Sequence, residues 1–291
     1  MKSKFIRKLS EAGSPQVNSL TNIQQNHYQS ASLLEESFSN SEKTFIHPTA
    51  IVSSNVTLGK NIKIGPYCII LGNVSIDDNT IIYSHVSIGA PAQDTGTHKS
   101  LGKIEIGKNC NIREFVTIGA SKYENGKTRI GNKCYIMSYS HIAHDVILED
   151  NVILINNVNL GGHVYIEKNA FLMANSAAHQ FCRIGQFCGL AAFSAINQDI
   201  PPFGTFFGLP AKFAGLNLVA LKRGGFPKED INTIKHLTKL FFQDKLLLDD
   251  IKKLAQKESN SWGSNNKVQD FIKFVENSNR GVSKKTIKDK T

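Results

Sequence analysis

Isoleucine, leucine or valine occupies every sixth position over three stretches of the chain, and a small or apolar residue follows four positions after most of them. The stretches run from Ile46 to Ile88, from Ile106 to Ile118 and from Ile130 to Ile196, where Ala178 is the one exception. A six-residue period fits neither an α-helix nor an alternating strand. Two inward positions in six residues are typical of one flat face of a parallel β-helix, whose three faces make a coil of about 18 residues. The pattern therefore predicts a mainly β protein built around an apolar column.

The repeat divides the chain into three parts. Residues 1–44 lack it, begin with a basic segment and are rich in Ser, Asn and Gln, so we expect a polar, flexible N-terminal extension. Residues 45–204 carry the repeat, with polar, glycine-containing breaks at 89–105 and 119–129. A solenoid places such insertions on its surface, where loops commonly form binding sites, so both breaks are candidate walls of an active site.

The sequence changes character after the repeat, and residues 205–291 are expected to form a small α-helical domain. Pro227 suits the first turn of a helix, and Glu229 and Asp230 suit its N-terminal dipole. One apolar stripe follows at helical spacing, consisting of Ile231, Ile234, Leu237 and Phe241. A second helix is predicted around Leu247 to Leu254 and a third near Val268 to Val275.

Composition narrows the classes of protein that fit. The chain has 291 residues, of which 41% are hydrophobic, and no apolar run approaches the length of about 18 residues that spans a bilayer. We therefore expect a soluble protein without an integral membrane segment. All five cysteines fall on inward positions of the repeat, which favours buried thiols, no disulfides and a reducing compartment such as the cytoplasm.

The net charge of +10 is concentrated near the C-terminus. Residues 205–291 carry 17 basic and 9 acidic side chains, whereas residues 46–204 carry 12 and 11. The excess is either a solvated lysine-rich helical face or a landing surface for an anionic partner such as a nucleotide, a phosphopantetheine group or an acidic carrier protein. No basic motif typical of nucleic-acid binding accompanies it, so nucleic acid is not an expected partner.

Four histidines between residues 141 and 179 carry the candidate chemistry. Residues 18 apart stack directly above one another in successive coils and form a column that we call a ladder. His144, Gly162 and Gln180 share one ladder, and Asp145 and His163 lie on the next. The repeat predicts that the His144 side chain faces outward, as an exposed imidazole below Gly162, which has no side chain. Acyl transfer needs a base for a hydroxyl or amine proton and a donor for the developing oxyanion. His144 and the Gly162 amide fit these two roles, with Asp145 or a nearby carbonyl orienting the ring.

Clustered histidines also bind zinc. His141 and His144 are three residues apart, but around the corner of a β-helix this spacing does not bring two ligands to one face as it does on an α-helix. Zinc ligation within one chain is therefore disfavoured, and a shared site between subunits stays open.

Four motifs together resemble the UDP-N-acetylglucosamine O-acyltransferase family, which catalyses the first step of lipid A synthesis. They are His141-Ile142-Ala143-His144-Asp145, Leu160-Gly161-Gly162-His163-Val164, His179-Gln180-Phe181-Cys182 and Leu221-Lys222-Arg223-Gly224-Gly225-Phe226, and the resemblance spans about residues 45–280. It implies a homotrimer of left-handed β-helices with active sites between subunits. It also implies transfer of an R-3-hydroxyacyl chain to the 3-hydroxyl of the sugar nucleotide. The donor would be the phosphopantetheine thioester of acyl carrier protein, with no metal or other cofactor.

The resemblance also implies roles for individual residues. His144 would be the general base, Asp145 its polar neighbour and Gly162 the oxyanion donor. The residues expected to hold the glucosamine are Gln93, Asp94, His141, His163 and His179, and those expected to contact the nucleotide or the pantetheine arm are Gln180, Asn217 and Arg223. Ala192 occupies a position where long-chain members tend to have glycine, which favours a somewhat shorter acyl chain.

The chain departs from the family pattern at four positions on the nucleotide side. Gly96 stands where the family usually has Lys, Gly119 where it has His, Val219 where it has Glu, and Gly224 where it has a second Arg. Alternatives therefore stay open: a related hexapeptide acyltransferase that uses another UDP-sugar, including N-acylation of an amino sugar, or acetyl-CoA; a carbonic-anhydrase-like zinc enzyme; and a non-catalytic paralogue.

Overall fold

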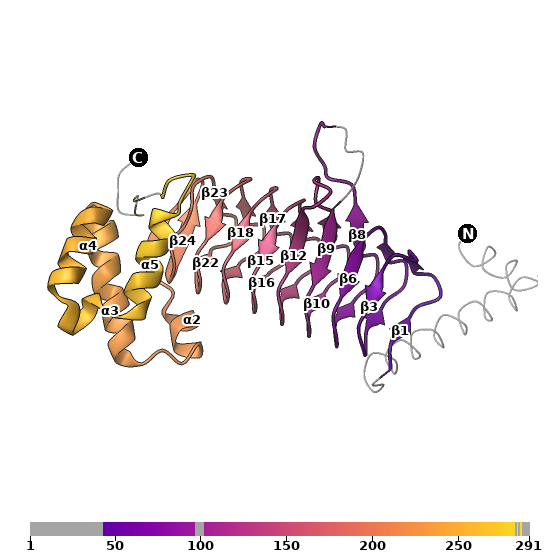
Figure 1. Ribbon diagram of the computed structural model, residues 1–291, viewed down its shortest axis with the longest axis horizontal. Coiled ribbons are helices and arrows are strands. Elements are labelled where there is room, and N and C mark those ends of the chain that lie inside the picture. The colour runs from indigo at the N-terminus through magenta and orange to yellow at the C-terminus, as the bar shows by residue number, and fades with distance from the viewer. Residues whose placement is uncertain (1–42, 97–101, 283, 285, 287–291) are drawn as a thin grey trace, which may run out of the picture. The chain divides into compact units, whose positions relative to one another are not determined.

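The computed structural model describes residues 43–96, 102–282, 284 and 286 of the chain. The extension predicted over residues 1–44 lies, except for its last two residues, outside the described part. The described residues form a left-handed parallel β-helix followed by helices, as the repeat and the resemblance predicted. Figure 1 shows the short strands stacked in successive coils, with helices α3, α4 and α5 after the last coil. No helix among the described residues is long and apolar enough to cross a membrane.

The β-helix has three faces, each a parallel sheet whose neighbouring strands come from successive coils. The first face consists of β1 (Phe45–Ile46), β4 (Lys63–Ile64), β7 (Ile81–Ile82), β10 (Asn111–Ile112), β13 (Tyr135–Ile136), β16 (Ile153–Leu154), β19 (Phe171–Leu172) and β22 (Gly189–Leu190). The second consists of β2 (Ile51–Val52), β5 (Ile69–Ile70), β8 (Ser87–Ala90), β11 (Thr117–Gly119), β14 (His141–Ile142), β17 (Asn159–Leu160), β20 (Ala177–Ala178) and β23 (Ala195–Ile196). The third consists of β3 (Thr57–Leu58), β6 (Val74–Ile76), β9 (Lys103–Ile106), β12 (Lys127–Ile130), β15 (Ile147–Leu148), β18 (Tyr165–Ile166) and β21 (Arg183–Ile184).

The six-residue repeat explains the column inside these faces. The last residue of most strands is the repeated Ile, Leu or Val, and those from Ile64 to Leu190 are almost completely buried. The small inward positions are buried beside them, including all five cysteine thiols. Corners between faces use the left-handed backbone conformation, which asparagine tolerates better than most residues, and Asn61, Asn79 and Asn109 take it with φ of 54–59°.

Both breaks in the repeat lie between strands that pair in neighbouring coils. Ser87 of β8 pairs with Thr117 of β11, and Thr117 pairs with His141 of β14. In both pairs the partners are further apart in the sequence than the 18 residues of a regular coil. The first loop leaves the solenoid after Ala90 and the second after Gly119. Both therefore leave from the second face, the face that carries His141.

The solenoid extends further along the chain than the sequence predicted. We placed its end at residue 204 because the repeat stops there, but β24 (Gly204–Gly208) pairs in parallel with β22 and turns back into the antiparallel strand β25 (Ala211–Leu216). These strands have a core of phenylalanines instead of the repeat, and the rings of Phe213 and Phe242 stack with centroids 3.9 Å apart. The aromatic cluster closes the end of the apolar column.

The helical region begins with α2 (Leu218–Arg223), which the sequence did not predict. The three predicted helices are present as α3 (Lys228–Thr238), α4 (Leu248–Lys257) and α5 (Asn266–Glu276). Two π-helical turns, Lys239–Gln243 and Ser259–Gly263, follow α3 and α4. The predicted stripe of α3 packs inward at Ile234 and Leu237, and Phe241 of the first π-helical turn continues it. Arg183 of β21 donates to the carbonyl oxygens of Phe274 and Asn277, which attaches α5 to the third face.

Candidate active site

One corner of the β-helix brings the predicted chemistry together. Asp145, His163 and Phe181 occupy this corner, between the second and third faces, in three successive coils, with φ of 61°, 62° and 66°. Because each coil turns in the same way, their side chains lie one above another along the edge. The rings of His163 and Phe181 stack, with centroids 4.5 Å apart and planes 5° apart. The ladder predicted from the repeat is therefore confirmed.

Gly162 lies directly over the imidazole of His144. A β-carbon at residue 162 would stand 2.5 Å from Cε1 and 2.6 Å from Nε2 of that ring, so only glycine fits without displacing it. The predicted pairing of the two residues is confirmed. The predicted exposure of the ring is wrong, because the side chain of His144 is only 8% exposed. Asp145, His163 and Gly162 surround this imidazole, which the repeat alone predicted to be open to solvent.

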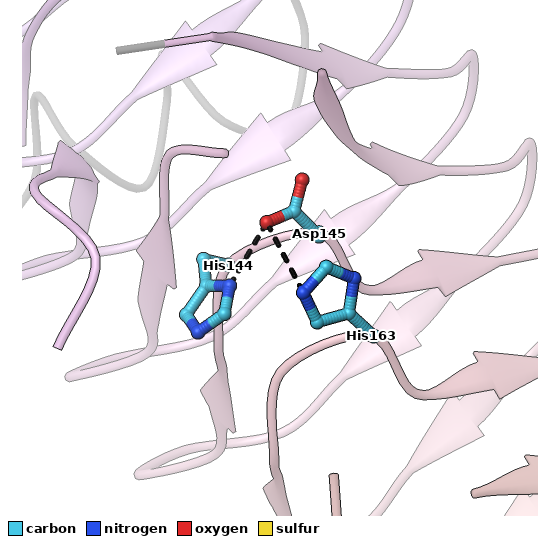
Figure 2. A group of neighbouring side chains, drawn as sticks. All are labelled: His144, Asp145 and His163. Atoms are coloured by element: carbon cyan, nitrogen blue, oxygen red, sulfur yellow. Dashed lines mark hydrogen bonds and ion pairs between the residues drawn. The ribbon is translucent and has the colours of Figure 1, made fainter. Parts of the chain in front are cut away.

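His144 and Asp145 form a hydrogen-bonded pair (Figure 2). Nδ1 of His144 lies 2.9 Å from Oδ2 of Asp145, and both side chains are 8% exposed. The carboxylate is an acceptor, so Nδ1 carries the proton in this pair and the lone pair of the neutral ring is left on Nε2. Nε2 and Cε1 are the two ring atoms on the Gly162 side, since both lie within 2.6 Å of the place where a β-carbon of residue 162 would stand. The basic nitrogen Nε2 of His144 and the backbone of Gly162 are therefore next to each other.

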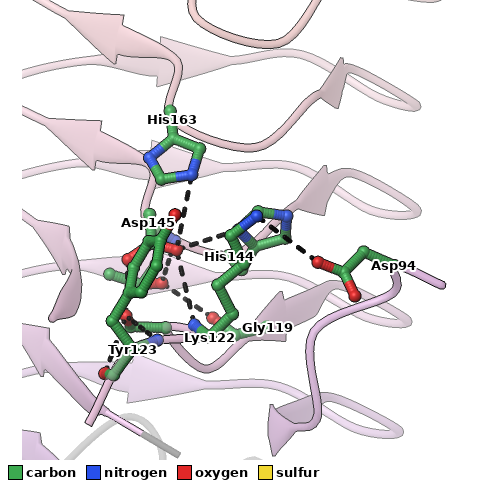
Figure 3. Close-up of polar contacts among 9 residues, drawn as sticks. Asp94, Gly119, Lys122, Tyr123, His144, Asp145 and His163 are labelled. Carbon is green, nitrogen blue, oxygen red and sulfur yellow. Dashed lines mark hydrogen bonds and ion pairs between the residues drawn. The ribbon is translucent and has the colours of Figure 1, made fainter. Parts of the chain in front are cut away.

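The loop after β11 holds the carboxylate of Asp145 in place. Ser121 donates its hydroxyl to Oδ1 at 2.5 Å, and the backbone N–H of Lys122 donates to Oδ2 at 3.4 Å. The backbone N–H of Asp145 donates to Thr128 Oγ1, and that hydroxyl donates in turn to the Gly119 carbonyl. Figure 3 shows these contacts converging on Asp145 from the loop.

His163 approaches the pair from the next coil. Its Nε2 is 3.8 Å from Oδ2 of Asp145, and this nitrogen is buried without a hydrogen-bond partner among the described residues. Burial lowers the pKa of His163, and the nearby charge of Asp145 only partly opposes that effect. The ring is consequently held neutral close to a carboxylate, where it is available to hydrogen-bond a ligand.

His144, Asp145 and His163 are also the described residues whose arrangement could hold a metal ion, since their ligand atoms lie within 4.8 Å of one another. Two of these atoms already share a 2.9 Å hydrogen bond, and Ser121 occupies the other oxygen of the carboxylate. A base held by a carboxylate accounts for these contacts without a metal ion. The expectation that no metal is needed stays a prediction.

A cavity of about 750 Å³ opens beside His144 on the second face. Its lining includes seven of the predicted site residues, namely Gln93, Asp94, His141, His144, Gly162, His179 and Gln180. His141 Nδ1 lies 2.7 Å from Thr117 Oγ1, and burial lowers the pKa of His141, with a further contribution from the charge of His144. His179 donates from Nδ1 to the carbonyl of Gln180. The two loop residues and the histidine cluster thus meet in one pocket.

The other predicted contacts lie outside this cavity, including His163, which lines hollows next to the third face. Asn217 caps the N-terminus of α2, where its side chain accepts from the Ala220 N–H and donates to the Phe187 carbonyl. Arg223 is exposed in the last turn of α2. Ala192 follows β22 and is partly exposed. A single chain does not bring these last three residues to His144.

Sequence reasoning did not identify Ser121, Lys122 and Thr128, which all form hydrogen bonds with Asp145. They lie in or next to the break at 119–129, which the sequence marked only as a candidate wall. It also missed Asn159, Asn197, Leu209 and Pro210, which line the cavity. Asn159 could have been found, because it lies one coil above His141.

The Gly162 amide is available as a donor. Its neighbours Gly161 and His163 donate to the carbonyl oxygens of Ala178 and His144, whereas the Gly162 N–H has no acceptor among the described residues. A free amide beside the unprotonated nitrogen of a histidine is an arrangement that can stabilise an oxyanion while a proton is removed.

Comparisons with known proteins agree with this chemistry. A family profile described as UDP-N-acetylglucosamine O-acyltransferase, domain 2, matches residues 199–283, and a profile of bacterial transferase hexapeptide repeats matches residues 55–90 and 127–162. Proteins named acyl-[acyl-carrier-protein]–UDP-N-acetylglucosamine O-acyltransferase are similar along most of the chain. The one from Sulfurovum is 41% identical over 256 residues, covering 81% of this chain and 96% of its own. The one from Bartonella henselae is 40% identical over 218 residues, covering 68% and 80%.

Solved structures show the same similarity. A UDP-N-acetylglucosamine acyltransferase from Bacteroides fragilis superposes with a TM-score of 0.74 at 29% identity, covering 82% of this chain and all of that one. The Campylobacter jejuni enzyme has the same TM-score at 31% identity, covering 82% and 98%. Similarity therefore extends over the solenoid and the helices together.

Proposed function

The chain belongs to the UDP-N-acetylglucosamine O-acyltransferase family, and from that premise we propose how its own residues carry out the reaction. The chain transfers an R-3-hydroxyacyl group from acyl carrier protein to the 3-hydroxyl of UDP-N-acetylglucosamine, the first step of lipid A synthesis. His144 is the general base. The observation that supports this assignment is the 2.9 Å contact between His144 Nδ1 and Asp145 Oδ2, which leaves Nε2 as a base beside Gly162.

The first step forms the new carbon–oxygen bond. Nε2 of His144 takes the proton of the sugar hydroxyl as its oxygen attacks the carbonyl carbon of the acyl thioester. Asp145 stabilises the imidazolium that results, and Ser121 and the Lys122 amide keep the carboxylate in place. The carbonyl oxygen becomes an oxyanion, which the Gly162 N–H stabilises by a hydrogen bond.

The second step breaks the carbon–sulfur bond. The tetrahedral intermediate collapses to an ester and expels the thiolate of the phosphopantetheine arm. The imidazolium of His144 returns its proton to that sulfur, so the enzyme regains its starting state. Protons and electrons balance between the two substrates, and no metal or other cofactor takes part.

The remaining predicted residues have binding roles. Gln93, Asp94, His141, His163 and His179 hold the glucosamine, and Gln180, Asn217 and Arg223 contact the nucleotide or the pantetheine arm. Because Asn217 and Arg223 lie away from the cavity of their own chain, a neighbouring protomer of a homotrimer would supply them. Ala192 limits the depth available to the acyl chain.

The partners follow from the same reaction. Acyl carrier protein is acidic, and residues 205–291 carry the basic excess of the chain, so the C-terminal helices are the proposed landing surface. The proposed location is the cytoplasm, a reducing compartment in which the five buried thiols stay reduced.

Mass spectrometry of the products tests the proposal. Purified protein is incubated with a panel of hydroxyacyl carrier proteins, acetyl-CoA, UDP-N-acetylglucosamine and a UDP-amino sugar. We expect one hydroxyacyl group on UDP-N-acetylglucosamine, and loss of turnover by at least about a thousandfold in His144→Ala. His47→Ala, which changes a partly exposed histidine next to β1, is the matched control and should keep full activity. An acetylated product, an N-acylated amino sugar or no product at all would reject the assignment.

A further inference from the structure

Lys122 joins the two loops that leave the second face. Its ammonium lies 3.4 Å from Oδ2 of Asp94 in the first loop, and its own backbone N–H lies 3.4 Å from Oδ2 of Asp145. One residue therefore contacts both a carboxylate that lines the cavity and the carboxylate that orients His144. Figure 3 shows the Lys122 side chain extending from the Asp145 side of the site to Asp94.

The backbone of Lys122 is firmly held. The Ser121 hydroxyl is bound to Asp145, and the Ser121 carbonyl accepts from the N–H of Gly102. On the far side of the same loop, the Gly126 carbonyl accepts from the N–H of Lys103. Because these contacts fix the base of the side chain, the ammonium has a limited range, and it lies 5.3 Å from the Tyr123 ring centroid.

Asp94 also accepts a hydrogen bond within its own loop. Its Oδ1 accepts the N–H of Gly96, two residues along, at 2.7 Å. The contact with Lys122 connects Asp94 to the loop whose backbone binds Asp145. The carboxylate of Asp94 is kept at the cavity wall that also contains His144.

We propose that Lys122 is a positioning residue, which acts through Asp94 to hold the acceptor sugar in the cavity beside His144. The proposal rests on the acyl transfer proposed above, in which Asp94 holds the acceptor sugar. Lys122 does not touch the reacting atoms. Its effect is on where Asp94 holds the acceptor before the proton is removed.

Stability alone does not account for this contact. Lys122 and Asp94 are 23% and 26% exposed, and ion pairs of that kind contribute about 0–1 kcal/mol to stability. Another ion pair of the same loop provides the comparison. Lys127 lies 2.9 Å from Glu105 on the third face, away from the cavity, and its side chain is more exposed. If the cation mattered only for holding the loop, both lysines would behave alike.

Steady-state kinetics of the full-length protein tests the proposal. We expect Lys122→Met to raise the KM for UDP-N-acetylglucosamine about tenfold, with kcat and the KM for the acyl carrier protein substrate changed less than about twofold. Lys122→Arg should recover most of the loss because it keeps the charge and the reach. Lys127→Met should match the wild type, and thermal unfolding should show all three variants folded.

A double-mutant cycle with Asp94→Asn decides whether Lys122 acts through Asp94. If it does, adding Lys122→Met to Asp94→Asn changes the KM by less than about twofold, although it changes the KM about tenfold in the wild type. Multiplied effects in the double variant, or an equal loss in Lys127→Met, would overturn the inference and leave the acyl transfer intact. A wild-type protein that neither acylates nor binds UDP-N-acetylglucosamine in calorimetry would overturn both.

Discussion

The Ser121 hydroxyl stands 2.5 Å from Oδ1 of Asp145, the carboxylate oxygen that His144 does not use. Ser121 is completely buried, and Asp145 is 8% exposed, so the contact is shielded from water. A carboxylate held at both oxygens has little freedom to rotate. The orientation of the His144 ring therefore depends on a loop residue that is not itself part of the β-helix.

Ser121→Ala should lower kcat about tenfold to a hundredfold with little change in the KM for either substrate. The removed hydrogen bond is made to a charged, buried acceptor, and such bonds contribute about 1.5–3 kcal/mol. Ser138→Ala is a control, because the partly exposed Ser138 also donates to a carboxylate, that of Glu114, at 2.9 Å, but outside the cavity. Equal kcat values for the two variants would show that Ser121 has no special part in orienting Asp145.

Gly162→Ala should abolish most activity while the protein stays folded. The new β-carbon would overlap the His144 ring, and the ring must turn away from its contact with Asp145. We expect kcat to fall at least about a hundredfold, which corresponds to roughly 2.7 kcal/mol of lost transition-state stabilisation. Thermal unfolding of the same preparation separates this effect from misfolding. An active variant would mean that the ring does not need its present position.

The repeat predicted those parts of the site that follow from coil geometry. Residues one coil apart must stack, so Gly162 over His144 and His163 over Asp145 could be placed from their numbers alone. The contacts of Ser121 and Lys122 could not, because a loop between coils has no period and its conformation depends on hydrogen bonds such as those at Asp145. Likewise α2 is only six residues long and carries no apolar stripe that a sequence would reveal. Strands β24 and β25 escaped prediction because phenylalanines replace the repeat there.

Asp145→Asn tests whether the carboxylate sets the tautomer of His144. An amide can present its NH₂ group to Nδ1, which favours the tautomer with the proton on Nε2 and removes the base. We expect kcat to fall about a thousandfold to ten-thousandfold, as when the carboxylate of a serine-protease triad becomes an amide. Product formation in single turnovers measures the chemical step directly. A loss smaller than about tenfold would mean that Asp145 is only a structural neighbour.

Stability should fall on the acid side of neutrality because of His141. Burial lowers the pKa of this imidazole in the folded protein below the ordinary value of 6.5, and the charge of His144 adds to the effect. The unfolded chain therefore takes up this proton first as the pH falls through 6.5, so the contribution of His141 to stability is present above that pH and is lost below it. Replacing the ring by an uncharged side chain removes this loss.

Urea unfolding near pH 5 and near pH 7.5, at one protein concentration, measures the effect. The wild type should lose stability between the higher and the lower pH, and His141→Gln should lose measurably less. His47→Gln changes a partly exposed histidine outside the cavity and should follow the wild type. The same dependence in all three proteins would place the acid sensitivity elsewhere in the chain. A smaller loss in His141→Gln alone would show that this histidine is kept neutral within the cavity, as its proposed role in binding an uncharged sugar requires.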